Sequence, residues 1–139
     1  MSMLSELAQY LADQGHGIVA AGGDTGTIFA GQLPDRPDDC VGLLESGGEP
    51  PIETFGAAAD ANPERPRLQV LVRAGAENYD AGRALAYAVW KALHEVANQT
   101  IGGVFYQSIR ALQSPAGLGR DDSQRWEWSI NFQITKQPS

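Results

Sequence analysis

A strict alternation of apolar and polar residues near the C-terminus constrains the fold of this 139-residue chain more than any other feature. In the segment WEWSINFQI, large apolar side chains occupy every second position: Trp126, Trp128, Ile130, Phe132 and Ile134. Successive side chains of a β-strand point to opposite faces of its sheet, so this pattern predicts a strand over 125–136 with one apolar face. We expect helices to cover that face only. The two tryptophans are expected to be structural, paired with Phe105 or Ile109 on the preceding strand.

Other segments show either this period of two or the period of an α-helix. Leu68, Val70 and Val72 alternate with polar residues and predict a strand over 67–74. Shorter strands are expected over 27–30, 40–45 and 102–112. Apolar residues at helical spacing predict helices over 2–14 and 80–98, the first ended by a left-handed Gly15 and the second burying Trp90.

Residues 46–66 break this regularity. The segment SGGEPPIETFGAAADANPERP contains four prolines together with several glycines and alanines. We interpret it as one long irregular loop with a short strand near 52–55. Residues 46–63 are expected to be mobile in an isolated subunit and ordered in the assembly. It is not a linker between domains, because neither flank could form a core alone.

Length and composition set the class of protein. A chain of 139 residues, 42% of them hydrophobic and 19% charged, forms a single globular domain over 1–139. No apolar run is long enough to cross a membrane, and the acidic start does not fit a secretory signal. Cys40 is the only cysteine, so an intramolecular disulfide is excluded and a reducing compartment is expected.

The net charge of −7 is divided unevenly along the chain. Residues 1–64 contain eleven acids and one base, whereas residues 65–139 contain six acids and nine bases. Acidic and basic parts on one molecule can attract copies of it head to tail, although solvated faces without such a role remain the alternative. The bases form no cluster and no basic helix, so tight nucleic-acid binding is not expected.

Motifs for catalysis or metal binding are weak. Asp24-Thr25-Gly26 matches the aspartic protease signature, but Ala20-Ala21-Gly22-Gly23 before it favours a turn over the apolar strand that such an enzyme needs. His16 and His94 have no partner at metal-ligand spacing. We therefore predict a protein that is not an enzyme and has no cofactor or metal, and we expect Asp24→Asn to remove no activity.

The order of these segments resembles a known family. The most telling pieces are Glu64-Arg65-Pro66 with the strand after it, and the loop from Pro115 through Leu118-Gly119-Arg120-Asp121-Asp122 to Arg125, followed by a strand containing Asn131-Phe132. Together with TIFAGQLPDRPDDC and YDAGRALAYAVWKALHEV, they resemble the tail terminator proteins, or minor capsid proteins, of long-tailed bacteriophages. The resemblance covers residues 4–135.

The resemblance implies an α+β domain with helices packed on one face of a mixed, mostly antiparallel sheet. It also implies a homohexameric ring that is assembled in the host cytoplasm and located in the virion. That ring caps the tail tube, stops its growth and joins it to the capsid neck, while genomic DNA passes through the lumen without sequence-specific binding. Its partners are therefore other copies of the chain, the tail tube protein and a neck protein. The alternatives are another neck component, such as a stopper or adaptor, and a small acidic binding module.

Charged residues are the candidates for contacts between subunits. Gly119 permits a turn, Asp121 or Asp122 accepts backbone hydrogen bonds at its corner, and Arg120 and Arg125 are expected to be free for a neighbour's carboxylates. Arg120→Glu with Arg125→Glu is expected to weaken self-association and leave the monomer folded. The complete candidate set is Arg67, Arg73, Arg120, Asp121, Asp122, Arg125, Asp38 and Asp39.

Overall fold

The computed structural model describes residues 2–20, 26–52 and 62–138. Its elements are α1 (Met3–Asp13), β1 (Ile28–Ala30), β2 (Cys40–Glu49), β3 (Arg65–Ala74), α2 (Tyr79–His94), β4 (Ala97–Ile101), β5 (Val104–Ala111), β6 (Ala116–Arg120) and β7 (Trp126–Lys136). The described strands form one sheet in the order β1-β2-β3-β7-β5-β4, and β6 also pairs with β7. Only β1 and β2 pair in parallel, so the predicted mixed, mostly antiparallel sheet is confirmed.

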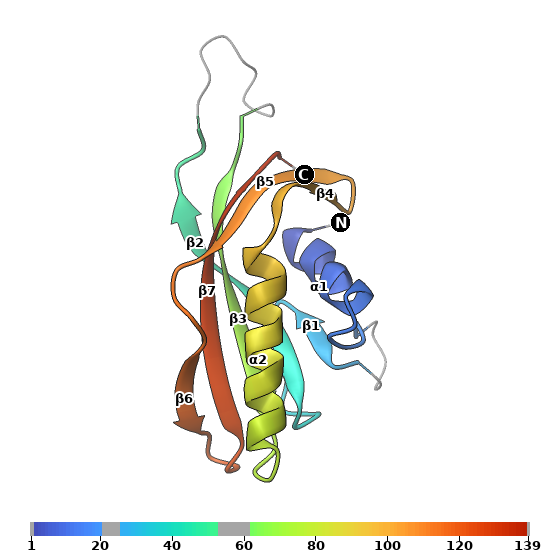
Figure 1. Cartoon of the computed structure of the whole chain (residues 1–139), viewed down its shortest axis with the longest axis vertical. Coiled ribbons are helices and arrows are strands. Elements are labelled where there is room, and N and C mark those ends of the chain that lie inside the picture. The colour runs from blue at the N-terminus through green and yellow to red at the C-terminus, as the bar shows by residue number, and fades with distance from the viewer. Residues whose placement is uncertain (1, 21–25, 53–61, 139) are drawn as a thin grey trace.

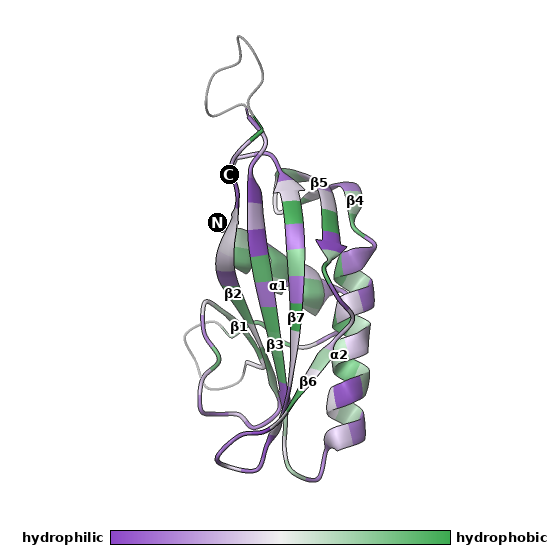
Figure 2. Ribbon diagram, turned by 90° about the vertical axis from the view of Figure 1, so that its left-hand side faces the viewer, coloured by the Kyte–Doolittle hydropathy of each residue, from purple (hydrophilic) through white to green (hydrophobic). Residues whose placement is uncertain are grey.

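Both helices pack on the same face of this sheet (Figure 1). α2 contacts β3, β5 and β7, while α1 contacts β1, β2 and β4. No helix of the described ranges lies over the opposite face, and polar and apolar bands alternate along β3 and β7 (Figure 2). In β7, Trp128, Ile130, Phe132 and Ile134 are buried in the core, as the period of two predicts.

α1 begins and ends with the expected capping interactions. Ser2 accepts a hydrogen bond from the backbone N–H of Ser5, which satisfies one of the free amides of the first turn. At the other end Gly15 has a φ of 86°, the left-handed conformation that glycine adopts without a steric cost. The backbone N–H groups of Gly15 and His16 donate to Ala12 and Leu11, as in a Schellman motif. The helix buries Leu7 and Leu11 against the sheet.

α2 is shorter than the sequence pattern predicts. The expected helix over 80–98 ends at His94, and residues 97–101 form the edge strand β4 instead. Asn98 has a φ of 51°, which is incompatible with a continuing helix and bends the start of the strand. The prediction was wrong here because Val96, which fits the helical stripe, is buried beyond the end of the helix.

Two segments read as loops contain paired strands. The region over 46–66 was expected to be irregular, but β2 continues to Glu49 and β3 already begins at Arg65. Residues 53–61, which include most of the strand expected near 52–55, lie outside the described residues. The segment 113–124 holds β6, which pairs with the first residues of β7.

The expected partners of the two tryptophans were also wrong. Trp126 lies opposite Ala74 and Arg120, and Trp128 lies opposite Val72 and Gly117. Ile109 lies opposite Ile134, at the other end of β7. The registers of β5 and β6 on β7 therefore place β6 beside the tryptophans and β5 at the other end of β7.

Candidate functional site

Charged side chains from three separate segments meet at the end of the sheet where β2 and β7 begin and β3 ends. We call this set the arginine cluster: Asp35, Asp38, Arg73, Asp121 and Arg125. The segment over 31–39 runs across this end of the sheet, and its carboxylates and carbonyls face the two guanidinium groups.

Arg125 is the centre of the cluster. Its side chain is only 10% exposed, and its Nε donates to Oδ2 of Asp121 at 2.8 Å. The other nitrogens reach Oδ1 of Asp35 at 3.3 Å and Oδ1 of Asp38 at 3.4 Å, and one also donates to the backbone carbonyl of Asp35. Burial lowers the pKa of Arg125, but the hydrogen bonds and charges of these carboxylates outweigh it and raise the pKa.

Asp121 forms the corner of the turn between β6 and β7. Its Oδ1 accepts the backbone N–H groups of Ser123 and Arg125, both at 2.9 Å. The backbone amide of Arg125 is the main reason that the pKa of Asp121 lies below its usual range. The prediction that Asp121 or Asp122 accepts backbone hydrogen bonds here is confirmed for Asp121.

Arg73 holds the same loop from the end of β3. It is 3% exposed, and it donates to the backbone carbonyls of Pro34 at 2.6 Å, Pro37 at 2.7 Å and Asp38 at 3.1 Å. Asp39 continues these contacts by accepting from the backbone N–H of Gly75 at 2.6 Å. The loop over 31–39 is therefore fixed to the sheet by charged hydrogen bonds.

The expectation that Arg125 is free for a neighbouring subunit was wrong. Arg73, expected on a polar strand face, is likewise buried under a loop of its own chain. The reason is that the acidic segment 35–39 folds across the end of the sheet, so part of the charge complementarity seen along the sequence is satisfied within one molecule.

The remaining candidates are more exposed. Arg120 lies over the ring of Trp126, with its guanidinium carbon 4.4 Å from the ring centroid, and donates to Gln124 at 3.2 Å. Arg67, on the open face of the sheet, pairs with Glu49 at 3.1 Å, and each side chain is more than 40% exposed. Asp122 is exposed. Whether these residues contact another subunit stays a prediction.

Tyr79 is a contact residue that sequence reasoning missed. Its ring lies 4.9 Å from that of Trp126 and 5.5 Å from that of Trp128. The three rings and the glycines of β6, Gly117 and Gly119, line a cavity of about 170 Å³. An aromatic residue at the start of a helix does not indicate by itself which residues it contacts. Only the fold therefore shows that Tyr79 packs against the two tryptophans.

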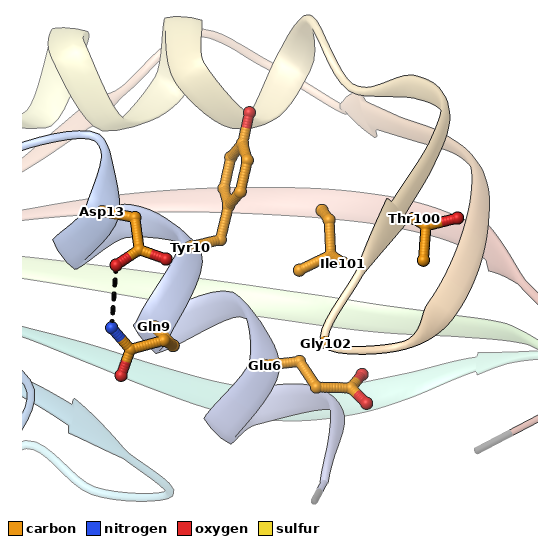
Figure 3. Close-up of a pocket in the computed structure, with 7 residues that line it drawn as sticks. All are labelled: Glu6, Gln9, Tyr10, Asp13, Thr100, Ile101 and Gly102. Carbon is orange, nitrogen blue, oxygen red and sulfur yellow. Dashed lines mark hydrogen bonds between the residues drawn. The ribbon is translucent and has the colours of Figure 1, made fainter.

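A second cavity, of about 240 Å³, lies between α1 and the turn that joins β4 to β5 (Figure 3). Glu6 and Tyr10 line it from α1, and Thr100, Ile101 and Gly102 line it from the opposite side. Glu6 is 2% exposed and accepts a hydrogen bond from the hydroxyl of Tyr106 at 2.8 Å. Burial, followed by this hydrogen bond, raises the pKa of Tyr106 well above its usual value.

The described residues contain no group of three or more His, Cys, Asp or Glu side chains that could hold a metal ion. His94 accepts a hydrogen bond from the backbone N–H of Ala111 at 2.9 Å, which is a structural contact. Most of the Asp24-Thr25-Gly26 motif lies outside the described residues. No helix in the described part of the chain is long and apolar enough to span a membrane.

A family model described as bacteriophage tail terminator protein matches residues 10–138. The chain belongs to the bacteriophage tail terminator family. It is therefore a structural protein of the phage virion, located in the tail. No curated protein matches the sequence.

A solved structure shares the fold of this tail terminator. The chain is similar to a protein in a structure titled "Virion of native gene transfer agent (GTA) particle", with a TM-score of 0.55 and 14% sequence identity. The match covers 80% of this chain and 78% of the other. For a tail terminator, the arginine cluster is a structural feature that shapes one end of the subunit.

Proposed function

We propose that this tail terminator forms a closed ring of about six copies that caps the end of the tail tube and stops its growth. The ring then joins the tail to the neck of the capsid, and the genome passes through its lumen without sequence-specific contacts. The observation that carries the proposal is the match of the terminator family model to nearly the whole chain, over residues 10–138. That match favours a terminator over a stopper or adaptor, and it removes the reason to consider a small acidic binding module.

The form of the subunit supports a ring. Helices cover one face of the sheet, while the other face carries polar side chains such as Arg67, Gln69 and Asn131 that are only half-buried. A subunit with two different sheet edges offers two different surfaces for a head-to-tail contact, and such contacts close into rings when the rotation between copies allows it. A chain with a net charge of −7 would also repel DNA moving through the lumen.

The function can be tested with the purified protein and the tail tube protein of the same phage. Light scattering and negative-stain electron microscopy are expected to reveal rings, either with the protein alone or at the ends of tubes. Adding the terminator to assembling tube protein should arrest elongation, which is measured as a shorter mean tube length. Tubes that grow to the same length with and without it, with no density at their ends, would refute the proposal.

A further inference from the structure

The sheet has strand edges that no segment among the described residues covers. An uncovered edge carries unpaired backbone N–H and C=O groups, and it pairs readily with a strand of another chain unless local structure prevents this. Two edges are the weaker candidates for such pairing. β1 has only three residues and bridges Val19 on its outer side, and β4 is bent at Asn98, whose φ is 51°.

β6 is the first of the remaining edges, and it has one β-bulge between Gly117 and Gly119. It pairs with β7 on one side, and no described residue pairs with its other side. All five residues of β6 are exposed, and Leu118 exposes 55% of its surface. Arg120, at its end, is the only charged residue of the strand.

The second remaining edge is the later half of β2, residues 44–49, which has a β-bulge between Glu45 and Gly48. β1 pairs with β2 only from Val41 to Leu43, so beyond this point β3 is the only strand in the described part of the chain that pairs with β2. Residues 45–49 are all exposed, and the segment carries Glu45 and Glu49 but no base. Glu49 already pairs with Arg67, whereas no described residue lies within ion-pair distance of Glu45.

The positions and directions of the two edges allow them to pair between copies. They lie on opposite sides of the sheet, since β2 precedes β3 in the strand order while β6 follows β7 (Figure 2). β2 and β7 both run antiparallel to β3, and β6 runs antiparallel to β7, so β6 and β2 have opposite directions. Two copies placed side by side in the same orientation therefore bring antiparallel edges together.

Charge and side-chain size select a register. When Arg120 lies opposite Glu45, the bulged part of β6 between Gly117 and Gly119 lies along the bulged part of β2 between Glu45 and Gly48. Leu118 is the only bulky side chain there, so no two bulky side chains meet. Arg120 and Glu45 then project from the same face, because Arg120 is the neighbour of Trp126 and Glu45 is the neighbour of the buried Leu68. Opposite charges on directly facing strand residues stabilise a pairing.

We propose that β6 of one copy pairs with residues 44–49 of the next copy, with Arg120 facing Glu45, and that this contact closes the ring. The inference rests on the ring function proposed above. The contact joins two different surfaces, so it repeats from copy to copy. β6 lies beside the beginning of β7 and residues 44–49 lie beside the beginning of β3, so neighbours are offset along the strands. Such an offset is what a curved sheet needs to close on itself.

Charge exchange tests the contact. Arg120→Glu and Glu45→Arg are each expected to raise the dissociation constant of self-association on the order of tenfold, because each places like charges opposite one another. The double variant, with the charges exchanged, is expected to assemble nearly as well as the wild type. Arg110→Glu, at an exposed position on β5, is the matched control and should have no effect. Circular dichroism verifies the fold of each variant. A double variant no better than the single ones would refute the contact.

Disulfide trapping provides a second test that does not depend on charge. Arg120→Cys combined with Glu45→Cys should give a ladder of cross-linked chains on oxidation, while Glu45→Cys combined with Lys91→Cys should not. Cys40 is 1% exposed and adds no background. A cross-linked dimer formed by Arg120→Cys alone would indicate a two-fold contact and would overturn the proposal.

The outcomes separate the two proposals. Rings seen by electron microscopy in which neither test has an effect would overturn this contact and leave the terminator function intact. A chain that stays monomeric both alone and with the tube protein would overturn the function, and the contact with it.

Discussion

At the scale of single residues, the two buried arginines define one end of the subunit. Arg73 and Arg125 hold the loop over 31–39 through hydrogen bonds to its carbonyls and carboxylates. The ion pairs within this set are unequal, because the side chain of Asp35 is 84% exposed and that of Asp38 is 51% exposed, against 18% for Asp121. Exposed pairs contribute little, so Asp121 and the backbone carbonyls account for most of the stabilisation.

Arg125→Ala is expected to lower the free energy of unfolding by about 2–4 kcal/mol, because it leaves Asp121 and several carbonyls without their donor. Urea unfolding monitored by tryptophan fluorescence measures the change. Arg110→Ala, an exposed arginine on β5, should change it by less than about 0.5 kcal/mol. Equal effects of the two substitutions would contradict the structural role of Arg125. Because of this role, Arg125→Glu is also expected to destabilise the monomer, so reversing Arg120 together with Arg125 does not isolate an interface effect.

The low pKa of Asp121 predicts a pH dependence. The carboxyl is held ionised in the folded chain by the Arg125 amide, so its contribution to stability is present above the unfolded pKa of about 3.9. That contribution is lost as the pH falls through the lower folded pKa. Unfolding measured between pH 6 and pH 3 should show a smaller loss of stability for Asp121→Asn than for the wild type. Parallel curves would argue against this assignment.

At the scale of secondary structure elements, the close packing of α2 on the sheet depends on a glycine. A Cβ atom added at Gly82 would lie 2.4 Å from Cβ of Ala74 and 2.7 Å from the Trp128 ring. Alanine favours a helix over glycine by about 1 kcal/mol, but overpacking of a core costs about 1–3 kcal/mol. Both close atoms belong to buried side chains that have no room to move aside. With alanine at position 82, α2 would therefore have to shift away from the sheet.

Gly82→Ala is therefore expected to destabilise the subunit despite the better helix propensity. Thermal unfolding by circular dichroism measures the effect. Ala84→Gly, at an exposed position of the same helix, gives the cost of propensity alone. An increase in melting temperature for Gly82→Ala would show that α2 can shift without loss of packing.

At the scale of the whole molecule, the stability of the sheet is uneven. β3 and β7 are paired on both sides and buried under the helices, whereas β6 and residues 45–49 of β2 are exposed. Strands without a covered face are marginally stable on their own.

Amide hydrogens of residues 45–49 and 116–120 are therefore expected to exchange faster than those of β3 and β7 in isolated subunits. In the assembled ring these two segments should become protected together. Hydrogen exchange with mass spectrometry, at concentrations below and above assembly, compares the two states. Protection of the segments in the monomer, or of only one of them in the ring, would count against pairing between copies.

The sequence alone determined the faces of the main elements. The alternation in β7 and the helical spacing of α1 and α2 are local and periodic. The position of a residue in such a pattern therefore predicts which face of the element it lies on. The residues of the terminator resemblance and the turn at Asp121 could be read from the chain in the same way. Register and edge strands could not, because β4 and β6 are short, polar or rich in glycine, and they become strands only by pairing with neighbours.

Tertiary structure alone decided which charges meet. Asp35 and Arg125 lie 90 positions apart, and no periodic pattern links them. The loop over 31–39 brings them together, so Arg73 and Arg125 are used within the subunit while Arg120 and Glu45 remain at the uncovered edges. Electrostatic attraction acts between neighbours in space, so the sequence could indicate that opposite charges were present, and only the fold could assign their partners.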